Sequence, residues 1–255
     1  MGYLHIQNLY KEQDILLFRE CYAMEKIHGT SAHIKFESNL KNPKITFFSG
    51  GEKHEKFVEL FDIEILSEKF QEHVDSGVDV IIYGEAYGGK CQGMSDTYGK
   101  SLKFIVFDVQ IGDCWLSVPQ AENVANKLGL DFVWWTKTDT NLEELNKLRD
   151  APSVQAVRNG MGNDKKSEGV VLRPLIEVTK NNGNRVICKH KRDDFRETKT
   201  SREVDPARQQ ILTEANEVAD EWVTKMRLEH VIDKLPFELD VTNIGKIIPA
   251  MIEDV

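Results

Sequence analysis

Apolar and polar residues alternate in many short runs over the first two thirds of the chain. Alternation of this kind is typical of strands with one face in a core, and β-branched and aromatic residues are frequent in these runs. The pattern predicts strands at Tyr22 to Met24, Ser31 to Phe36, Lys44 to Phe48, Val78 to Tyr83, Lys103 to Val109, Gly169 to Arg173 and Arg185 to His190. Asn182-Gly183-Asn184 is expected to form the turn before the last of these strands.

Apolar residues at helical spacing separate these runs. The spacing predicts helices at about Glu55 to His73, Pro119 to Leu128 and Leu142 to Asp150, the last with Asn141 as its N-cap. Strands mixed with helices in this way indicate an α+β fold, in which antiparallel sheets are flanked by helices.

The character of the chain changes near residue 203. Asp205 can cap a helix that has Pro206 at its first position, and apolar residues then recur at helical spacing as far as Val231. This predicts one long amphipathic helix ending before Pro236, followed by a second over Asn243 to Ile252, interrupted at Pro249. We therefore expect a domain over residues 1–202 and a helical C-terminal appendage over residues 203–255.

Composition narrows the class of protein. The chain has 255 residues, is 40% hydrophobic and contains no apolar run near eighteen residues and no signal peptide pattern. Its four cysteines are scattered without a Cys-x-x-Cys pair, which favours neither a zinc site nor a disulfide framework. We expect an intracellular protein, cytoplasmic or viral in a host cytoplasm, without a membrane partner. The net charge of −9 indicates that any nucleic acid would meet a local cleft rather than the whole surface.

Lys26 is the leading candidate for catalysis. It lies in Glu25-Lys26-Ile27-His28-Gly29-Thr30, between two predicted strands. A lysine amine can attack phosphorus once it has lost a proton, and Gly29 would let the chain pass close to a phosphate. A lone Lys-x-x-Gly occurs often by chance, so the case for this site depends on residues further along the chain.

Four later segments each carry a group that nucleotide transfer needs. A carboxylate after a strand could bind a ribose, one of two phenylalanines on opposite faces of a strand could stack on a base, a second carboxylate could hold a divalent metal, and two lysines on one strand face could contact phosphates. The residues are Glu85, Phe104 with Phe107, Glu168, and Lys189 with Lys191. Three of these segments have a structural alternative: an exposed turn for Glu85, a pair of core rings for the phenylalanines, and an edge strand protected by lysines for Lys189 and Lys191.

A second phosphate-binding motif is not supported. Gly84 to Lys90 fits the start of a P-loop, Gly-x-x-x-x-Gly-Lys. Cys91 stands where a P-loop needs Ser or Thr, and no helical pattern comes after it.

In this order, the segments resemble those of the covalent nucleotidyltransferases, which comprise ATP-dependent DNA and RNA ligases and mRNA capping enzymes. The closer resemblance is to the phage RNA ligase 2 family, which includes the RNA-editing ligases. It covers about residues 20–197 and is most specific at the motif from Glu25 to Thr30 and at Asn182-Gly183-Asn184-Arg185-Val186. The resemblance implies an ATP-grasp-like ligase adenylylation domain, that is, a nucleotidyltransferase fold.

The resemblance also implies roles for individual residues. Lys26 would become lysyl-AMP, and the nucleotide would be bound by Glu25 at the adenine edge, Ile27, Glu85 at the ribose, Phe104 stacked on adenine with Phe107 as its core partner, Glu168 with the metal, and Lys189 and Lys191 at the phosphates. The implied cofactors are ATP and Mg²⁺ or Mn²⁺. The implied partner is RNA with 5′-phosphate and 3′-hydroxyl ends, nicked or paired, as in RNA repair, and the protein is expected to be a monomer.

Two positions depart from the family pattern, and other functions remain open. Ser31 stands where the family has Asn, and Ser49 lies near the place of a family Arg, for which Lys53 or His54 could substitute. A catalytically impaired nucleotide-binding or RNA-binding module would keep the fold without forming a covalent adduct. DNA ligases and capping enzymes carry a strand-rich OB domain, which the helical pattern after residue 203 does not match.

Overall fold

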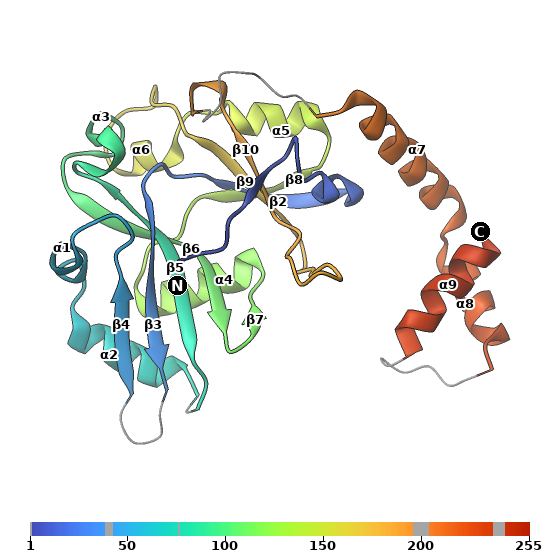
Figure 1. Cartoon of the computed structure of the whole chain (residues 1–255), viewed down its shortest axis with the longest axis horizontal. Helices are drawn as coiled ribbons and strands as arrows, with labels where there is room; N and C mark the ends of the chain where they lie inside the picture. Colours follow the sequence, from blue (N-terminus) through green and yellow to red (C-terminus); the bar gives the residue numbers. More distant parts are fainter. Residues whose placement is uncertain (1, 39–42, 76, 196–203, 237–242) are drawn as a thin grey trace. The chain divides into compact units, whose positions relative to one another are not determined.

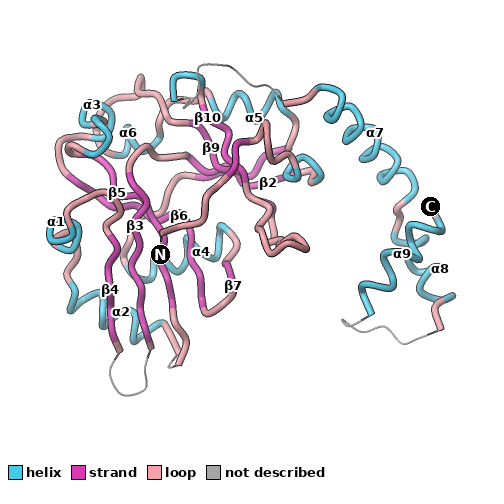
Figure 2. Tube along the Cα trace, in the orientation of Figure 1, coloured by secondary structure: helices cyan, strands magenta, loops and turns pink. Residues whose placement is uncertain are grey.

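The computed structural model describes residues 2–38, 43–75, 77–195, 204–236 and 243–255. The chain divides into two compact units, Met1–Glu203 and Val204–Val255. The larger unit contains two sheets with flanking helices, and the smaller unit is helical (Figures 1 and 2). The predicted α+β class is confirmed.

The first sheet contains both the first and the last strand of the larger unit. Its strand order is β1 (Gln7–Asn8), β10 (Cys188–Lys191), β9 (Gly169–Pro174), β2 (Glu20–Glu25) and β8 (Trp135–Asp139). Every neighbouring pair is antiparallel except β1 and β10, which run parallel, with Gln7 opposite Cys188. The start of the chain therefore lies beside the last strand.

The second sheet has the order β4 (Lys44–Phe48), β3 (Thr30–Glu37), β5 (Val80–Gly88), β6 (Leu102–Ile111) and β7 (Cys114–Trp115), with all neighbours antiparallel. One irregularity matters for the site. Tyr83 lies opposite Asp108, but Gly84 lies opposite Val106, so Phe107 is the extra residue of a β-bulge.

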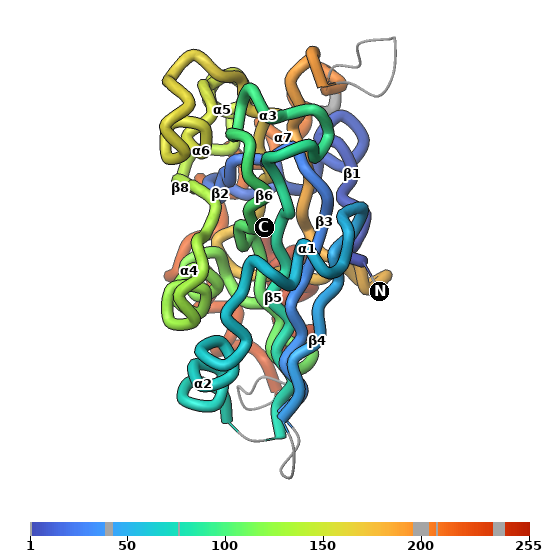
Figure 3. Tube along the Cα trace, turned by 90° about the vertical axis from the view of Figure 1, so that its left-hand side faces the viewer, coloured from blue at the N-terminus to red at the C-terminus, as the bar shows by residue number. Residues whose placement is uncertain are grey.

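Each face of the second sheet has a different cover. Ala32, Ile34 and Phe36 alternate with polar residues along β3 and are buried. Helices α2 (Ile63–His73) and α4 (Val118–Leu128) lie together on this buried side, whereas the N-terminal segment lies on the opposite side (Figure 3). The face away from α2 and α4 is thus the one that meets the start of the chain.

The predicted helix over Glu55 to His73 is wrong, because two helices occupy this stretch. Helix α1 (His54–Val58) ends before a turn, and Asp62 then caps α2 by accepting a hydrogen bond from the Ile65 N–H at 3.1 Å. The other helices of this unit are α3 (Ser95–Tyr98), α5 (Leu142–Arg149) and α6 (Val154–Arg158), with short 3-10 turns at Asp14–Leu17, Cys91–Gly93 and Asp193–Phe195. Asn141 caps α5, as predicted.

The second unit consists of α7 (Pro206–Trp222), α8 (Lys225–Lys234) and α9 (Ile244–Asp254). Asp205 caps α7, as predicted, but the single long helix is wrong, because Val223 leaves the helical conformation and Thr224 caps α8. Helix α9 continues through Pro249. None of the helices in the described part of the chain is both long and apolar enough to cross a membrane.

Candidate active site

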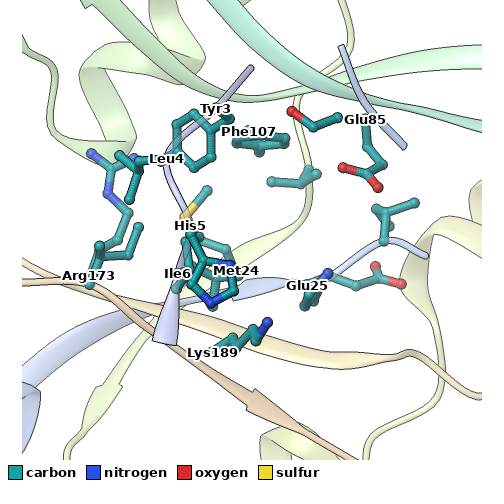
Figure 4. Close-up of a pocket in the computed structure, with 16 residues that line it drawn as sticks. Tyr3, Leu4, His5, Ile6, Met24, Glu25, Glu85, Phe107, Arg173 and Lys189 are labelled. Atoms are coloured by element: carbon teal, nitrogen blue, oxygen red, sulfur yellow. The ribbon is translucent and has the colours of Figure 1, made fainter. Parts of the chain in front are cut away.

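A cavity of about 330 Å³ opens in the larger unit, within the size range of small-molecule sites. Part of its lining is apolar and part is charged. The apolar part includes Met24, Ile27, Phe107, Val133 and Val171, and the charged part includes Lys26, Glu85 and Lys189 (Figure 4).

Lys26 follows the last residue of β2 and lines the cavity. Its backbone N–H donates to the Gly169 carbonyl at 2.9 Å, which ties this point of the chain to the start of β9. Its amine donates to Glu168 Oε2 at 2.9 Å. The predicted nucleophile is therefore held at both its backbone and its side chain.

Gly29 allows a close approach that no other residue would allow. A Cβ at this position would lie 2.3 Å from the Ala86 carbonyl oxygen. The Gly29 N–H donates to Glu85 Oε1 at 3.1 Å. This close contact with β5 joins the loop after Lys26 to the second sheet.

Glu168 precedes β9 and connects three basic side chains. Its carboxylate contacts Lys26, His28 Nδ1 at 3.1 Å and Lys191 Nζ at 2.8 Å, and the residue is only 2% exposed. Burial alone would raise the pKa of Glu168, but His28, Lys26 and Lys191 outweigh it and hold the pKa at about 2. Glu168 is therefore ionised at neutral pH.

Glu85 lies inside β5 rather than in a turn after it. The strand continues to Gly88, with Glu85 paired between Ser31 and Ile105, so the predicted strand end at Tyr83 is wrong. Burial raises the pKa of Glu85 to about 7, against the opposing charge of Lys26. Near neutral pH this carboxyl group can therefore be either a donor or an acceptor toward a hydroxyl.

Lys189 and Lys191 lie on one face of β10, as their spacing predicts. Lys189 lines the cavity, and Lys191 contacts Glu168. The alternative of a lysine-protected edge strand is wrong at Lys189, because β1 covers one side of β10 there and β9 covers the other. The strand is also shorter than predicted, beginning at Cys188 rather than at Arg185.

The ring in the cavity is Phe107, not Phe104. Phe104 packs against Phe57 and Phe61, with ring centroids 5.4 and 5.6 Å apart. It covers Gly84 on the opposite face of the sheet, where a Cβ would meet the Phe104 ring at 2.4 Å. The structure therefore places Phe104 in the packing against α1 and Phe107 at the cavity, the reverse of the expected arrangement, because Phe104 lies opposite Ala86, which packs with Phe57 on that face of the sheet.

The carboxylate of Glu25 also has a different partner from the one expected. It accepts hydrogen bonds from Ser153 Oγ at 2.5 Å and from the Gln155 N–H at 3.0 Å, at the start of α6. Figure 4 shows it turned away from the centre of the cavity. Ile27, by contrast, contributes to the apolar lining.

The two departures from the family pattern differ in position. Ser31 lines the cavity, and its buried Oγ has no hydrogen-bond partner among the described residues. Ser49 Oγ donates to the Glu52 carbonyl at 2.9 Å and so faces its own loop. Neither Lys53 nor His54 belongs to the cavity lining.

Sequence reasoning missed two parts of the site. His28 lies inside the predicted motif, but its bond to Glu168 depends on a residue far along the chain. The segment from Tyr3 to Ile6 also lines the cavity, but its sequence contains no motif that would predict a place in the site.

A metal could be held by the two carboxylates beside Lys26. In the part of the chain that the structure describes, no three His, Cys, Asp or Glu side chains form a metal-binding group. Mg²⁺ commonly binds through one or two carboxylates together with substrate phosphates. Glu85 lines the cavity and offers one such carboxylate, whereas the Glu168 oxygens contact Lys26, His28 and Lys191, one of which a metal at Glu168 would have to replace.

Comparisons with known proteins agree with this geometry. The family model described as RNA ligase matches residues 19–191. Among curated proteins, no sequence matches the chain.

Solved structures of a Naegleria gruberi RNA ligase share the fold. One with PPi has a TM-score of 0.56 at 15% identity, and mutants with ATP and Mn and with AMP and Mn give 0.56 and 0.57 at 14%. The matches cover 76% of this chain and 57% of that one, so this chain spans a little over half the length of that enzyme. The RNA ligase family model matches more than half of the residues of this chain, so the chain belongs to the RNA ligase family.

Proposed function

We propose that this protein is an ATP-dependent RNA ligase that joins 3′-hydroxyl and 5′-phosphate ends through a lysyl-AMP intermediate on Lys26. One observation carries the proposal. The Lys26 amine lines a part-apolar, part-charged cavity and is hydrogen-bonded to a carboxylate that has two further basic partners.

In the first step, the Lys26 nitrogen attacks the α-phosphorus of ATP. A nitrogen–phosphorus bond forms, the bond from phosphorus to the pyrophosphate oxygen breaks, and the amine gives up a proton. The amine must also leave Glu168. His28 remains hydrogen-bonded to that carboxylate when Lys26 moves to the phosphate.

The other residues of the cavity have roles that follow from their chemistry. Glu85 would bind the ribose, Phe107 would stack on the base, and Lys189 and Lys191 would contact the phosphates. Mg²⁺ or Mn²⁺, held by Glu168 and Glu85 with the phosphates, would neutralise phosphate charge. The Naegleria ligase structures with ATP and Mn and with AMP and Mn support this choice of nucleotide and metal.

Two further steps complete the reaction. The AMP group passes from Lys26 to the 5′-phosphate of RNA, which releases the lysine. The 3′-hydroxyl then attacks that phosphate, a phosphodiester bond forms and AMP leaves. The RNA class rests on the family match, and nicked or paired RNA is the proposed substrate.

The first step is tested by incubating the pure protein with ATP or GTP labelled at the α-phosphate, followed by a denaturing gel. Label from ATP is expected on Lys26. Lys26→Ala should abolish it, and Lys26→Arg should not restore it, because a guanidinium stays protonated. Lys137→Ala is the matched control, since this lysine lies on β8, pairs with Glu20 of β2 and does not line the cavity. Absence of label on the wild-type protein, or label on another residue, would contradict the proposal.

The polynucleotide class is tested separately. The adenylylated protein is given nicked duplexes that carry either RNA or DNA strands, with and without a 5′-phosphate. Sealing of the phosphorylated RNA nick is expected. Preferential sealing of DNA would reject the RNA assignment while leaving the first step intact.

A further inference from the structure

The N-terminal segment contributes a wall of the cavity that lies outside the family match. Tyr3, Leu4, His5 and Ile6 line the cavity, whereas the RNA ligase model begins at residue 19. Figure 4 shows Tyr3 beside Phe107 at one end of the cavity, with Lys189 at the opposite end. The segment thus meets the site at the ring proposed to hold the base.

Tyr3 is fixed by its hydroxyl group. It donates to Asp108 Oδ2 at 2.6 Å, and Asp108 is fully buried. The same carboxylate accepts from Arg173 Nη1 at 2.9 Å and from Arg185 Nη1 at 2.7 Å. Burial raises the pKa of Tyr3 well above its usual value, and Asp108 adds to the effect, so the phenol stays protonated and keeps donating.

The Tyr3 ring is fixed as well. It makes an edge contact with Phe107 at 4.9 Å between centroids, and it also contacts Tyr83 at 5.0 Å and Trp115 at 5.8 Å. Arg185 lies over the Trp115 ring at 4.0 Å, so the hydroxyl and ring contacts share one framework. Phe107 itself is a bulge residue, which the sheet pairing alone orients less firmly than its neighbours.

We propose that Tyr3 is a positioning residue of the nucleotide site, which orients Phe107 for stacking on the base and holds the wall from Leu4 to Ile6 in place. This rests on the proposed function, because it assumes that the cavity binds a nucleotide. If Tyr3 has this role, its loss should weaken binding of the base but not binding of the phosphates. Lys189 and Lys191, the residues proposed for the phosphates, lie on β10, which keeps its pairing with β9 when Tyr3 is changed.

Binding of the base and binding of the phosphates can be measured separately with two ligands. AMP carries base, ribose and phosphate, whereas inorganic pyrophosphate carries phosphate alone. Calorimetric titration of both ligands is done with the wild-type protein, Tyr3→Phe and Tyr3→Ala, at a temperature where each variant is shown to be folded. Tyr10→Ala is the matched control, because it removes an aromatic residue from the same stretch outside the cavity lining.

Tyr3→Ala should raise the Kd for AMP about tenfold, the size expected when an aromatic pair is lost. The Kd for pyrophosphate should change less than about twofold, within the variation expected for a site left intact. Tyr3→Phe keeps the ring but loses the bond to Asp108, so the Kd for AMP should rise only about threefold. Tyr10→Ala should leave both affinities unchanged.

Several outcomes would overturn the inference. Unchanged AMP affinity in folded Tyr3→Ala would remove any positioning role. An equal loss of AMP and pyrophosphate binding would indicate general loosening of the unit and would reject it too. A wild-type protein that binds pyrophosphate but not AMP would overturn both this inference and the proposed function.

Discussion

Two carboxyl groups beside Lys26 have pKa values shifted in opposite directions. Glu168 has three basic partners and a pKa held at about 2, whereas burial raises the pKa of Glu85 to about 7. One group is a permanent anion and the other changes charge near neutrality. Burial raises the pKa of both groups, but at Glu168 it is outweighed by His28, Lys26 and Lys191, whereas at Glu85 it is not outweighed.

Glu85 should make the stability of the protein depend on pH. Its pKa in the folded state is above the usual value of about 4.5, so its stabilising contribution is complete below that pH and is lost as the pH rises through about 7. The loss can reach roughly 3 kcal/mol. Glu85→Gln cannot ionise, so its melting temperature should exceed that of the wild type at pH 8 and match it at pH 5. Glu143→Gln, at an exposed glutamate of α5, is the control. Equal differences at both pH values would show that Glu85 does not titrate in this way.

Alanine substitutions at Phe104 and Phe107 should have different effects, the first mainly on stability and the second mainly on ATP binding. Phe107→Ala should weaken ATP binding and lower the melting temperature less than Phe104→Ala does, since its ring faces the cavity. Phe104→Ala should lower the free energy of unfolding by about 3 kcal/mol while labelling per folded molecule persists, because its ring packs against Phe57 and Phe61. Thermal melts and ATP titration of both variants check this. The reverse pattern would restore Phe104 as the stacking ring.

At the scale of elements, alternation in the sequence predicted the longer strands well, and β4 has the predicted bounds. Short elements were missed because their pairing partners define them. Strand β1 exists only beside β10, and β8 (Trp135–Asp139) is a mostly polar run that pairs with β2. The bulge at Phe107 could not be predicted from the sequence, because it is defined only by how β6 pairs with β5.

Helix α6 depends on Glu25, and this gives an element-scale prediction. Glu25→Ala would leave Ser153 Oγ and the Gln155 N–H without their acceptor, at a cost of about 2 kcal/mol in the free energy of unfolding. The ratio of ATP to GTP labelling should stay the same, because the carboxylate faces α6. Denaturant unfolding and the two labelling rates check the prediction. A changed nucleotide ratio would instead support the expected contact with the adenine edge.

At the scale of the whole molecule, the candidate site belongs to one unit. Every residue that lines the cavity lies between Tyr3 and Lys189, and Glu168 and Lys191 also belong to Met1–Glu203. The proposed assignment of adenylylation to residues 1–202 follows from this. The smaller unit exposes apolar residues on its helices, among them Ile211, Val218 and Met226, and nothing in the sequence indicated a role for them.

Removal of residues 204–255 tests this assignment. The remaining chain should label itself with AMP at a rate close to that of the full chain, since the cavity residues are all retained. Labelling time courses for both proteins check the rate, and sealing of nicked RNA by each shows what the smaller unit contributes later in the reaction. Loss of labelling in a truncated protein that is still folded would place part of the site in the smaller unit.

The pairing of β1 with β10 has a consequence for the protein as it is synthesised. Gln7 leaves the ribosome before its partner Cys188, which emerges only after most of the larger unit has been made. The cavity wall from Tyr3 to Ile6 and the lysine at position 189 therefore cannot be in place together until late in translation. Contacts of such long sequence separation form slowly. A growing chain should thus be unable to bind a nucleotide, and acquisition of ATP binding would report that the larger unit is complete.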